Sequence, residues 1–389
     1  MRTFARTAAV TALCLAVAAS PAAAATWAVT PTPGGDLSRL NGVAATSATG
    51  AWAVGSAYDF TLGAERTLVE RWNGTSWSRV ASPNGSQLYN RLYAVDAASA
   101  ADAWAVGFVE TAHGVNGGGD GPKKAAAWHW NGTAWSIGDL PGAAGTPSVT
   151  GVDALSAADA WAVGSYYDPV APARGEVYTA HWNGAAWTRV AAPAPGDYLN
   201  EVTSVSGTSG ADVWAVGEWR DQGKGQVYHP LALHWDGAAW NSVAAPDPAG
   251  GTGGALRAVK AISPTDVWAV GYRDYRTPVA FHYDGTAWRE VALPAPGGTG
   301  NTILYGLAAT AADHVWAVGY TSSGAVTPES LVLRWDGAAW RSELAPPSDL
   351  GSTLLGAAAV GGSVLAVGYR NVLSGGTTTN RTYGLRGLN

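Results

Sequence analysis

Cysteine is almost absent from this chain of 389 residues, since Cys14 is the only one and it lies near the N-terminus. The remainder therefore has no disulfide framework, and its stability must come from packing. Histidine occurs seven times, but no spacing typical of metal ligands is present. We expect neither a metal site nor a cofactor.

Charge is also scarce, at 13% of residues, and the formal net charge is −6. A mildly acidic chain without basic clusters is a poor candidate for binding nucleic acid or an anionic membrane. Beyond the N-terminal segment, no stretch approaches the ~20 apolar residues that a transmembrane helix needs. Apolar residues nevertheless make up 47% of the chain, which is enough for a sizeable core.

The first 25 residues resemble an export signal. Arg2 and Arg6 precede an apolar run from Ala8 to Ala19, and small residues up to Ala25 form an A-x-A-type cleavage site. We predict a Sec-type signal peptide over residues 1–25, a secreted protein, and one domain over residues 26–389 that acts as a monomer.

A four-residue string recurs along the rest of the chain. Trp-Ala-Val-Gly begins at Trp52, Trp104, Trp161, Trp214, Trp268 and Trp316, and a degenerate copy, Leu-Ala-Val-Gly, begins at Leu365. The mean period is about 52 residues, which is typical of propeller blades and longer than most solenoid repeats.

A second motif lies between successive copies of the first. It has the form aromatic-Asn/Asp-Gly-x-x-Trp and starts at Trp72, Trp130, Trp182, Trp235, Tyr283 and Trp335. Asn-Gly or Asp-Gly between apolar runs is a strong hairpin signal, because both residues tolerate the positive φ of a type I′ turn. Each copy therefore predicts two antiparallel strands joined by such a turn.

Four strands fit in each repeat: a short inner strand, the Trp-Ala-Val-Gly strand, and the two strands of the hairpin. The last repeat has no fourth strand, whereas the segment from Thr26 to Gly34 matches the fourth-strand segment from Trp187. We therefore predict an all-β, seven-bladed β-propeller with four antiparallel strands per blade, whose ring is closed by the N-terminal strand.

Most tryptophans recur at fixed positions of the repeat, which indicates that they pack blade against blade. Four histidines precede the first aromatic residue of a hairpin, at His129, His181, His234 and His282. They belong to different blades, so packing is a better interpretation for them than a shared metal site.

These motifs resemble kelch repeats of the galactose-oxidase type over the whole of residues 26–389. The hairpin Asp-Gly-x-x-Trp is also similar to that of seven-bladed bacterial lectins. The chain departs from kelch repeats because Gly55, Gly107 and their equivalents are followed by Ser, Phe, Glu or Tyr rather than by a second glycine. The copper chemistry of galactose oxidase needs a cysteine-crosslinked tyrosine, and residues 26–389 contain no cysteine.

The loops between the second and third strands of the blades vary in length and lie on one face of a propeller. Such variation is typical of a binding face, although unconstrained loops would also drift. Four of these loops carry an aromatic residue beside or near an acid, which gives the candidate ligand-binding residues Tyr58, Asp59, Tyr167, Asp168, Trp219, Asp221, Tyr272 and Asp274. A ring beside a carboxylate suits a sugar, whereas an acid that caps its own turn is the alternative.

No catalytic residues are identified. Carboxylates for glycoside hydrolysis exist at Glu110, Asp120, Glu176, Asp197 and Glu218, but nothing selects a pair. The leading hypothesis is a secreted, non-enzymatic propeller that recognises carbohydrate or a cell-surface glycan through its loop face. An extracellular polysaccharide hydrolase or lyase and a protein–protein interaction scaffold are the alternatives.

Overall fold

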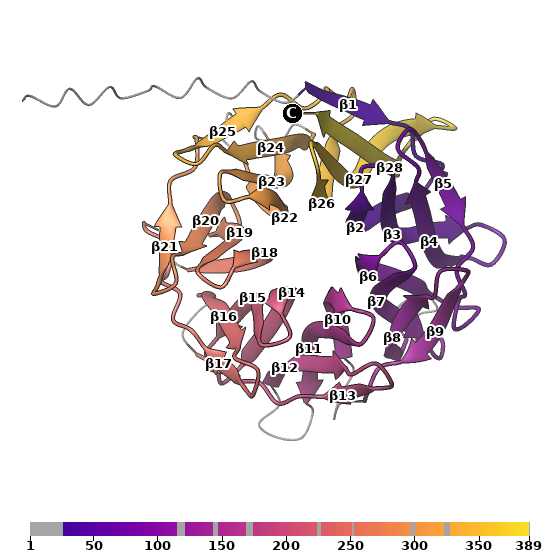
Figure 1. Cartoon of the computed structure of the whole chain (residues 1–389). Coiled ribbons are helices and arrows are strands. Elements are labelled where there is room, and N and C mark those ends of the chain that lie inside the picture. The colour runs from indigo at the N-terminus through magenta and orange to yellow at the C-terminus, as the bar shows by residue number, and fades with distance from the viewer. Residues whose placement is uncertain are drawn as a thin grey trace, which may run out of the picture.

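The computed structural model describes residues 26–114, 121–142, 147–168, 174–223, 227–250, 253–295, 300–322 and 327–388. In these ranges the chain forms seven four-stranded antiparallel sheets, arranged as blades around a central axis (Figure 1). The predicted all-β, seven-bladed propeller is therefore confirmed. The predicted signal peptide, residues 1–25, lies outside the described residues. None of the described residues forms a helix long and apolar enough to cross a membrane.

Six blades use their strands in chain order from the axis outward, and the blade formed by the last three strands of the chain has the N-terminal strand as its outermost strand (Figure 1). The innermost strands are β2 (Ser38–Ser47), β6 (Asn90–Ser99), β10 (Pro147–Ser156), β14 (Leu199–Ser209), β18 (Gly254–Ser263), β22 (Thr302–Ala311) and β26 (Ser352–Val360). The second strands are β3 (Gly50–Asp59), β7 (Asp102–Glu110), β11 (Asp159–Asp168), β15 (Asp212–Arg220), β19 (Asp266–Arg273), β23 (His314–Thr321) and β27 (Ser363–Ser374).

The third strands are β4 (Ala64–Trp72), β8 (Lys123–Trp130), β12 (Arg174–Trp182), β16 (His229–Trp235), β20 (Thr277–Tyr283), β24 (Glu329–Trp335) and β28 (Thr377–Leu388). The outer strands are β5 (Trp77–Val80), β9 (Trp135–Asp139), β13 (Trp187–Arg189), β17 (Trp240–Ser242), β21 (Trp288–Val291), β25 (Trp340–Glu343) and β1 (Thr26–Thr30). We number the blades 1 to 7 from β2; blade 7 consists of β26, β27, β28 and β1.

The glycine of the Trp-Ala-Val-Gly strand lies where the inner strand bulges. In blade 4 the pairing slips between Val202 and Ser204, next to Gly217. A Cβ on Gly217 would lie 1.8 Å from the carbonyl oxygen of Glu201, and the equivalent distance in blade 1, from Gly55, is 2.0 Å. Only glycine permits this approach of two backbones, which explains why the residue recurs in every blade.

Tryptophan packs blade against blade, as predicted. The Trp of a second strand contacts the aromatic pair that flanks the hairpin of the next blade, as Trp52 does with Trp130 (ring centroids 4.8 Å apart) and Trp135 (5.1 Å). The same arrangement repeats around the ring, for example where Trp161 meets Trp235 and Trp240. Such tilted and edge-on pairs add to the stabilisation from area burial.

The hairpin turns differ from the prediction. The glycines have positive φ, as in Gly74 (+100°), whereas the preceding Asn and Asp residues do not. Instead the Asn73 Oδ1 atom accepts the backbone N–H groups of Thr75 (3.0 Å) and Ser76 (2.9 Å). The predicted type I′ geometry is therefore wrong: the connection is a four-residue loop between the paired Trp72 and Trp77, and its Asn acts through its side chain as a turn cap.

The four hairpin histidines have structural partners. In blade 2, His129 stacks on Trp104 with centroids 4.2 Å apart, and its Nε2 atom lies 2.9 Å from Asp102 Oδ2. The same His–Asp contact occurs in blades 3, 4 and 5. The acid at the start of the second strand therefore orients the ring that covers the repeated Trp.

The ring closes as predicted, because β1 pairs with β28 from Thr26–Leu388 to Thr30–Gly384 (Figure 1). Trp27 is buried, and its Nε1 atom donates to Glu343 Oε2 of blade 6 (2.7 Å). On the other side Thr30 Oγ1 accepts the indole N–H of Trp77 in blade 1 (3.2 Å). The closing strand is thus fastened to both neighbouring blades.

Candidate functional site

The acids of the predicted loop pairs lie in or beside turns. Asp59 Oδ1 accepts the N–H groups of Thr61 (2.8 Å) and Leu62 (3.2 Å), and Asp221 Oδ1 accepts the N–H of Asp197 (3.3 Å). Asp274 has a positive φ of 51° in the turn between β19 and β20. The side chain of Asp168 lies outside the described part of the structure.

The aromatic members of these pairs have different surroundings. Tyr167 is 55% exposed, whereas Tyr58 is half-buried and packs edge-on against Phe60. Trp219 stacks on His229 with centroids 4.4 Å apart. Tyr272 is buried, at 4% exposure. The four pairs belong to blades 1, 3, 4 and 5, and among the described residues no ring contact joins the aromatic member of one pair to that of another.

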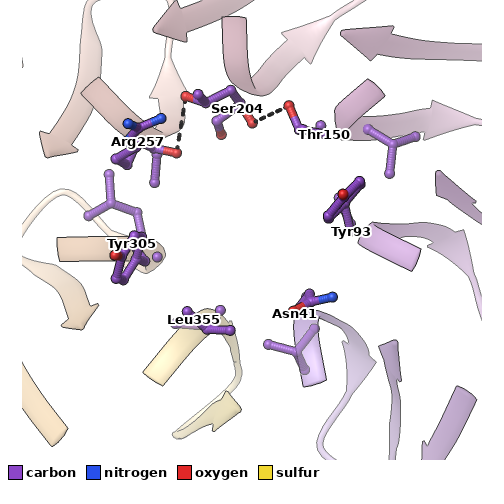
Figure 2. A pocket seen from close by; sticks show the side chains of 18 of the residues that line it. Asn41, Tyr93, Thr150, Ser204, Arg257, Tyr305 and Leu355 are labelled. Carbon is purple, nitrogen blue, oxygen red and sulfur yellow. Dashed lines mark hydrogen bonds between the residues drawn. The ribbon is translucent and has the colours of Figure 1, made fainter. Parts of the chain in front are cut away.

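Two cavities lie instead along the central axis, where the inner strands face one another (Figure 2). One cavity of about 220 Å³ opens toward the loop face, and a second of about 190 Å³ lies nearer the hairpin turns. The two share a ring of seven apolar side chains: Val43, Val95, Val152, Val205, Val259, Leu307 and Ala357. Every blade contributes one of them, because the inner strands are in the same register.

The cavity that opens toward the loop face is also lined by one further residue from each inner strand, at equivalent positions of the repeat. Unlike the apolar ring, these residues differ from blade to blade: Asn41, Tyr93, Thr150, Thr203, Arg257, Tyr305 and Leu355. The amide of Asn41 and the hydroxyls of Thr150 and Thr203 donate to backbone carbonyls of the next blade, at 2.6, 3.2 and 3.0 Å. These three residues therefore join neighbouring blades. Tyr93 lies across the opening from Arg257 and Tyr305 (Figure 2), and these three larger polar side chains are placed to meet a ligand.

Arg257 is held by residues from two blades. Its Nη2 atom donates to the hydroxyl of Tyr272 (2.7 Å) and lies 3.8 Å from Glu218 Oε2. Burial, opposed by Arg257, raises the pKa of Glu218 to about 7. Although burial lowers the pKa of Arg257, Glu218 and Tyr272 together raise it above its ordinary value, so this guanidinium remains charged.

A second charged group lies in blades 1 and 2. Arg91 donates twice to the carboxylate of Glu65, from Nε (2.6 Å) and from Nη2 (2.6 Å). Arg39, two positions before Asn41 in β2, is half-buried. Its pKa is lowered by burial and by the charge of Arg91.

Tyrosines extend the site toward the surface. Tyr305 stacks on Tyr320 at 6.2 Å, and burial raises the pKa of Tyr305 to about 12. Tyr275 is 45% exposed and lies 5.0 Å from Tyr272 and 5.5 Å from Tyr228, measured between ring centroids. Its φ is +55°, next to the positive φ of Asp274. Two adjacent non-glycine residues with left-handed backbone conformation are strained. In this turn the strained backbone places the Tyr275 ring against Tyr272 and Tyr228.

The carboxylates considered for hydrolysis are dispersed. Glu110 is buried and accepts the N–H groups of Gly121 (2.7 Å) and Tyr89 (3.2 Å), and Glu176 pairs with Arg174. Asp197 accepts the backbone N–H of Gln222, in the loop between β15 and β16, and Asp120 lies outside the described residues. Only Glu218 belongs to the group around Arg257. The described residues contain no cluster of three or more metal-ligating side chains.

Sequence reasoning missed the channel positions. The inner strands are rich in small residues, and the bulge changes which of their side chains faces the axis. One signal for these positions was present in the sequence. When the repeats are aligned, Tyr93, Arg257 and Tyr305 stand out as large polar residues among the small residues of the inner strands.

No family model and no curated protein matches the chain. Among solved structures, YCF48 bound to a D1 peptide is 15% identical with a TM-score of 0.53, and the match covers 93% of this chain and 96% of that one. YCF48 from Cyanidioschyzon merolae is 18% identical (TM-score 0.49; 94% and 98% covered). A mutant of Aleuria aurantia lectin in complex with alpha-methyl-L-fucoside is 11% identical (TM-score 0.46; 81% and 98% covered). At these identities the likeness concerns the fold alone, and the resemblance to kelch repeats stays a prediction.

Proposed function

We propose that this protein is a secreted, non-enzymatic binding propeller that recognises carbohydrate at the loop-face mouth of its central channel. The observation that carries the proposal is the convergence of Tyr93, Tyr305 and Arg257 on a cavity of about 220 Å³. Tyrosine presents an apolar face for the C–H surface of a sugar and a hydroxyl for its polar groups. Arginine adds several donors in a fixed plane.

The size of the cavity limits what can enter. Pockets for drug-sized ligands hold roughly 300–1,000 Å³, so this channel suits one sugar unit, with the rest of a glycan lying over the loops. Exposed aromatic residues of the loop face, such as Tyr167 and Tyr275, are available to that outer part. The loop residues predicted from the sequence would then form an outer zone around the channel.

A glycan array followed by calorimetry tests the proposal. We expect Tyr93→Ala and Tyr305→Ala each to weaken binding at least about tenfold, the equivalent of ~1.4 kcal/mol. Leu344→Ala is the control, because Leu344 is 93% exposed, directly follows the outer strand β25 and does not line the channel. Absence of binding to any glycan at high valency would refute the proposal. Loss of binding on Tyr167→Ala, with the channel variants unaffected, would move the site to the loops.

An enzyme is the second candidate, and Glu218 is the observation that favours it, because a carboxyl with a pKa of about 7 can act as a general acid. Release of products from a polysaccharide panel, lost in Glu218→Gln, would support hydrolysis. If Glu218→Gln changes neither product release nor binding, the carboxyl serves only to hold Arg257.

A further inference from the structure

The arginine pair of blades 1 and 2 carries a net positive charge. Arg39 and Arg91 are both cationic, and Glu65 supplies one negative charge. The Glu65 carboxylate pairs with Arg91, from which it accepts two hydrogen bonds of 2.6 Å. Within the described ranges, Arg39 makes no ion pair with a carboxylate. Glu65 is therefore the one carboxylate near two guanidinium groups. A half-buried charge that is only partly compensated is costly to maintain, and a bound anion would relieve that cost.

Arg39 lies beside the channel mouth rather than on the outer surface. It is two residues from Asn41, which lines the cavity. Its charge interacts with Arg91 and Glu65 and with the hydroxyl groups of Tyr93 and Tyr369. Tyr93 lies on the side of the channel opposite Arg257 and Tyr305 (Figure 2). Because the charge of Arg39 interacts with the Tyr93 hydroxyl, an anionic group at Arg39 would be on the same side as Tyr93.

We propose that Arg39 binds the carboxylate of an acidic sugar, so that the carbohydrate recognised at the channel is a uronate-type glycan. The planar guanidinium matches a carboxylate with two parallel hydrogen bonds, and Arg91 with Glu65 already forms that geometry in the same region. The other carboxylates of the mouth, Glu201 and Glu218, interact with Arg257 instead. This inference rests on the proposed function, since it specifies the ligand of the same site.

Calorimetry with trigalacturonate and with its methyl ester, at physiological salt, tests the inference in the full chain. We expect the acid to bind at least about tenfold more tightly than the ester, and Arg39→Gln to remove that difference. Arg39→Lys, which keeps the charge but not the planar fork, should retain part of it. Arg341→Gln is the matched control, because Arg341 is exposed and pairs with Asp336 in a hairpin of the opposite face; it should leave both affinities unchanged.

The outcomes separate the two proposals. Equal binding of acid and ester, unaffected by Arg39→Gln, would overturn the carboxylate site and leave carbohydrate binding intact. Binding of polyglutamate but of no saccharide would overturn the proposed function as well. If Arg39→Gln does not fold, as judged by circular dichroism, Arg39→Lys and the comparison of acid with ester in the unaltered protein still decide the question.

Discussion

The indole N–H of Trp27 offers a test of how the ring is closed. The Nε1 atom of Trp27 donates to the buried carboxylate of Glu343 at 2.7 Å. By contrast, the Nε1 atom of Trp240, at an equivalent outer-strand position in blade 4, is buried without a partner. Trp27→Phe and Trp240→Phe both replace an indole by a smaller ring, but only the first removes a hydrogen bond to a charged group.

The expected difference follows from that contrast. A hydrogen bond to a charged group contributes about 1.5–3 kcal/mol, so Trp27→Phe should lower the free energy of unfolding by about that much more than Trp240→Phe. With an unfolding entropy of about 2.1 cal/mol/K per residue over roughly 360 residues, the extra loss corresponds to about 2–4 °C in Tm.

Differential scanning calorimetry of both variants measures the difference. Val29→Ala is the control within the closing strand, because Val29 is 44% exposed; it should change Tm little. Equal losses for Trp27→Phe and Trp240→Phe would refute a special role for the Glu343 contact. An unchanged Tm after removal of residues 26–30 would refute closure by β1 altogether.

Three further results are expected. Gly217→Ala, whose Cβ would lie 1.8 Å from a backbone oxygen, should cost more than about 3 kcal/mol in chemical denaturation, whereas Gly138→Ala, with no atom within 4 Å of its Cβ, should cost far less. Burial raises the pKa of Glu70 to about 8, above its value of about 4.3 in the unfolded chain. The contribution of Glu70 to the stability of the folded state is therefore largest below pH ~4.3 and is lost as the pH rises to about 8. Because Glu70→Gln cannot ionise, its stability relative to the parent protein should be greater at pH 9 than at pH 5. An equal difference at both pH values would contradict the assignment. Tyr275→Gly relieves a positive φ of 55° in the three-residue turn between the paired Arg273 and Thr277, a conformation that favours glycine. Thermal denaturation should therefore show a loss of stability of no more than about 1 kcal/mol despite the missing ring, and a loss above about 2 kcal/mol would show that the ring contacts outweigh the strain.

The architecture was predictable because repetition makes each local signal count several times. Seven copies of the second strand and the match of Trp27 to Trp187 were sufficient for the blade number and the closing strand. The turn geometry was not predictable from the dipeptide, because Asn73 can serve a turn either by adopting a positive φ or by accepting backbone N–H groups with its side chain. The structure uses the second option.

The site was less predictable for a different reason. Aromatic–acid pairs such as Tyr58–Asp59 stand out in a sequence, but the same dipeptides arise where an acid caps a loop, and Asp59 does so. The contact of Arg257 with Tyr272 and Glu218 depends on inner and second strands of two blades. No local stretch of sequence indicates such a contact. The residue type at the one channel position of each repeat, by contrast, can be read from the sequence when the repeats are aligned.

The pairing of Thr26 with Leu388 places both ends of the closing sheet at the same edge. A pulling force applied between these ends would load the hydrogen bonds of β1 and β28 one after another, as in peeling, and not all at once, as in shear. The ring is therefore mechanically weakest where it is closed, even though the Trp27 and Thr30 contacts fasten that strand chemically. A tether at only one end would not load this seam, so the way in which the protein is anchored decides whether tension opens the propeller.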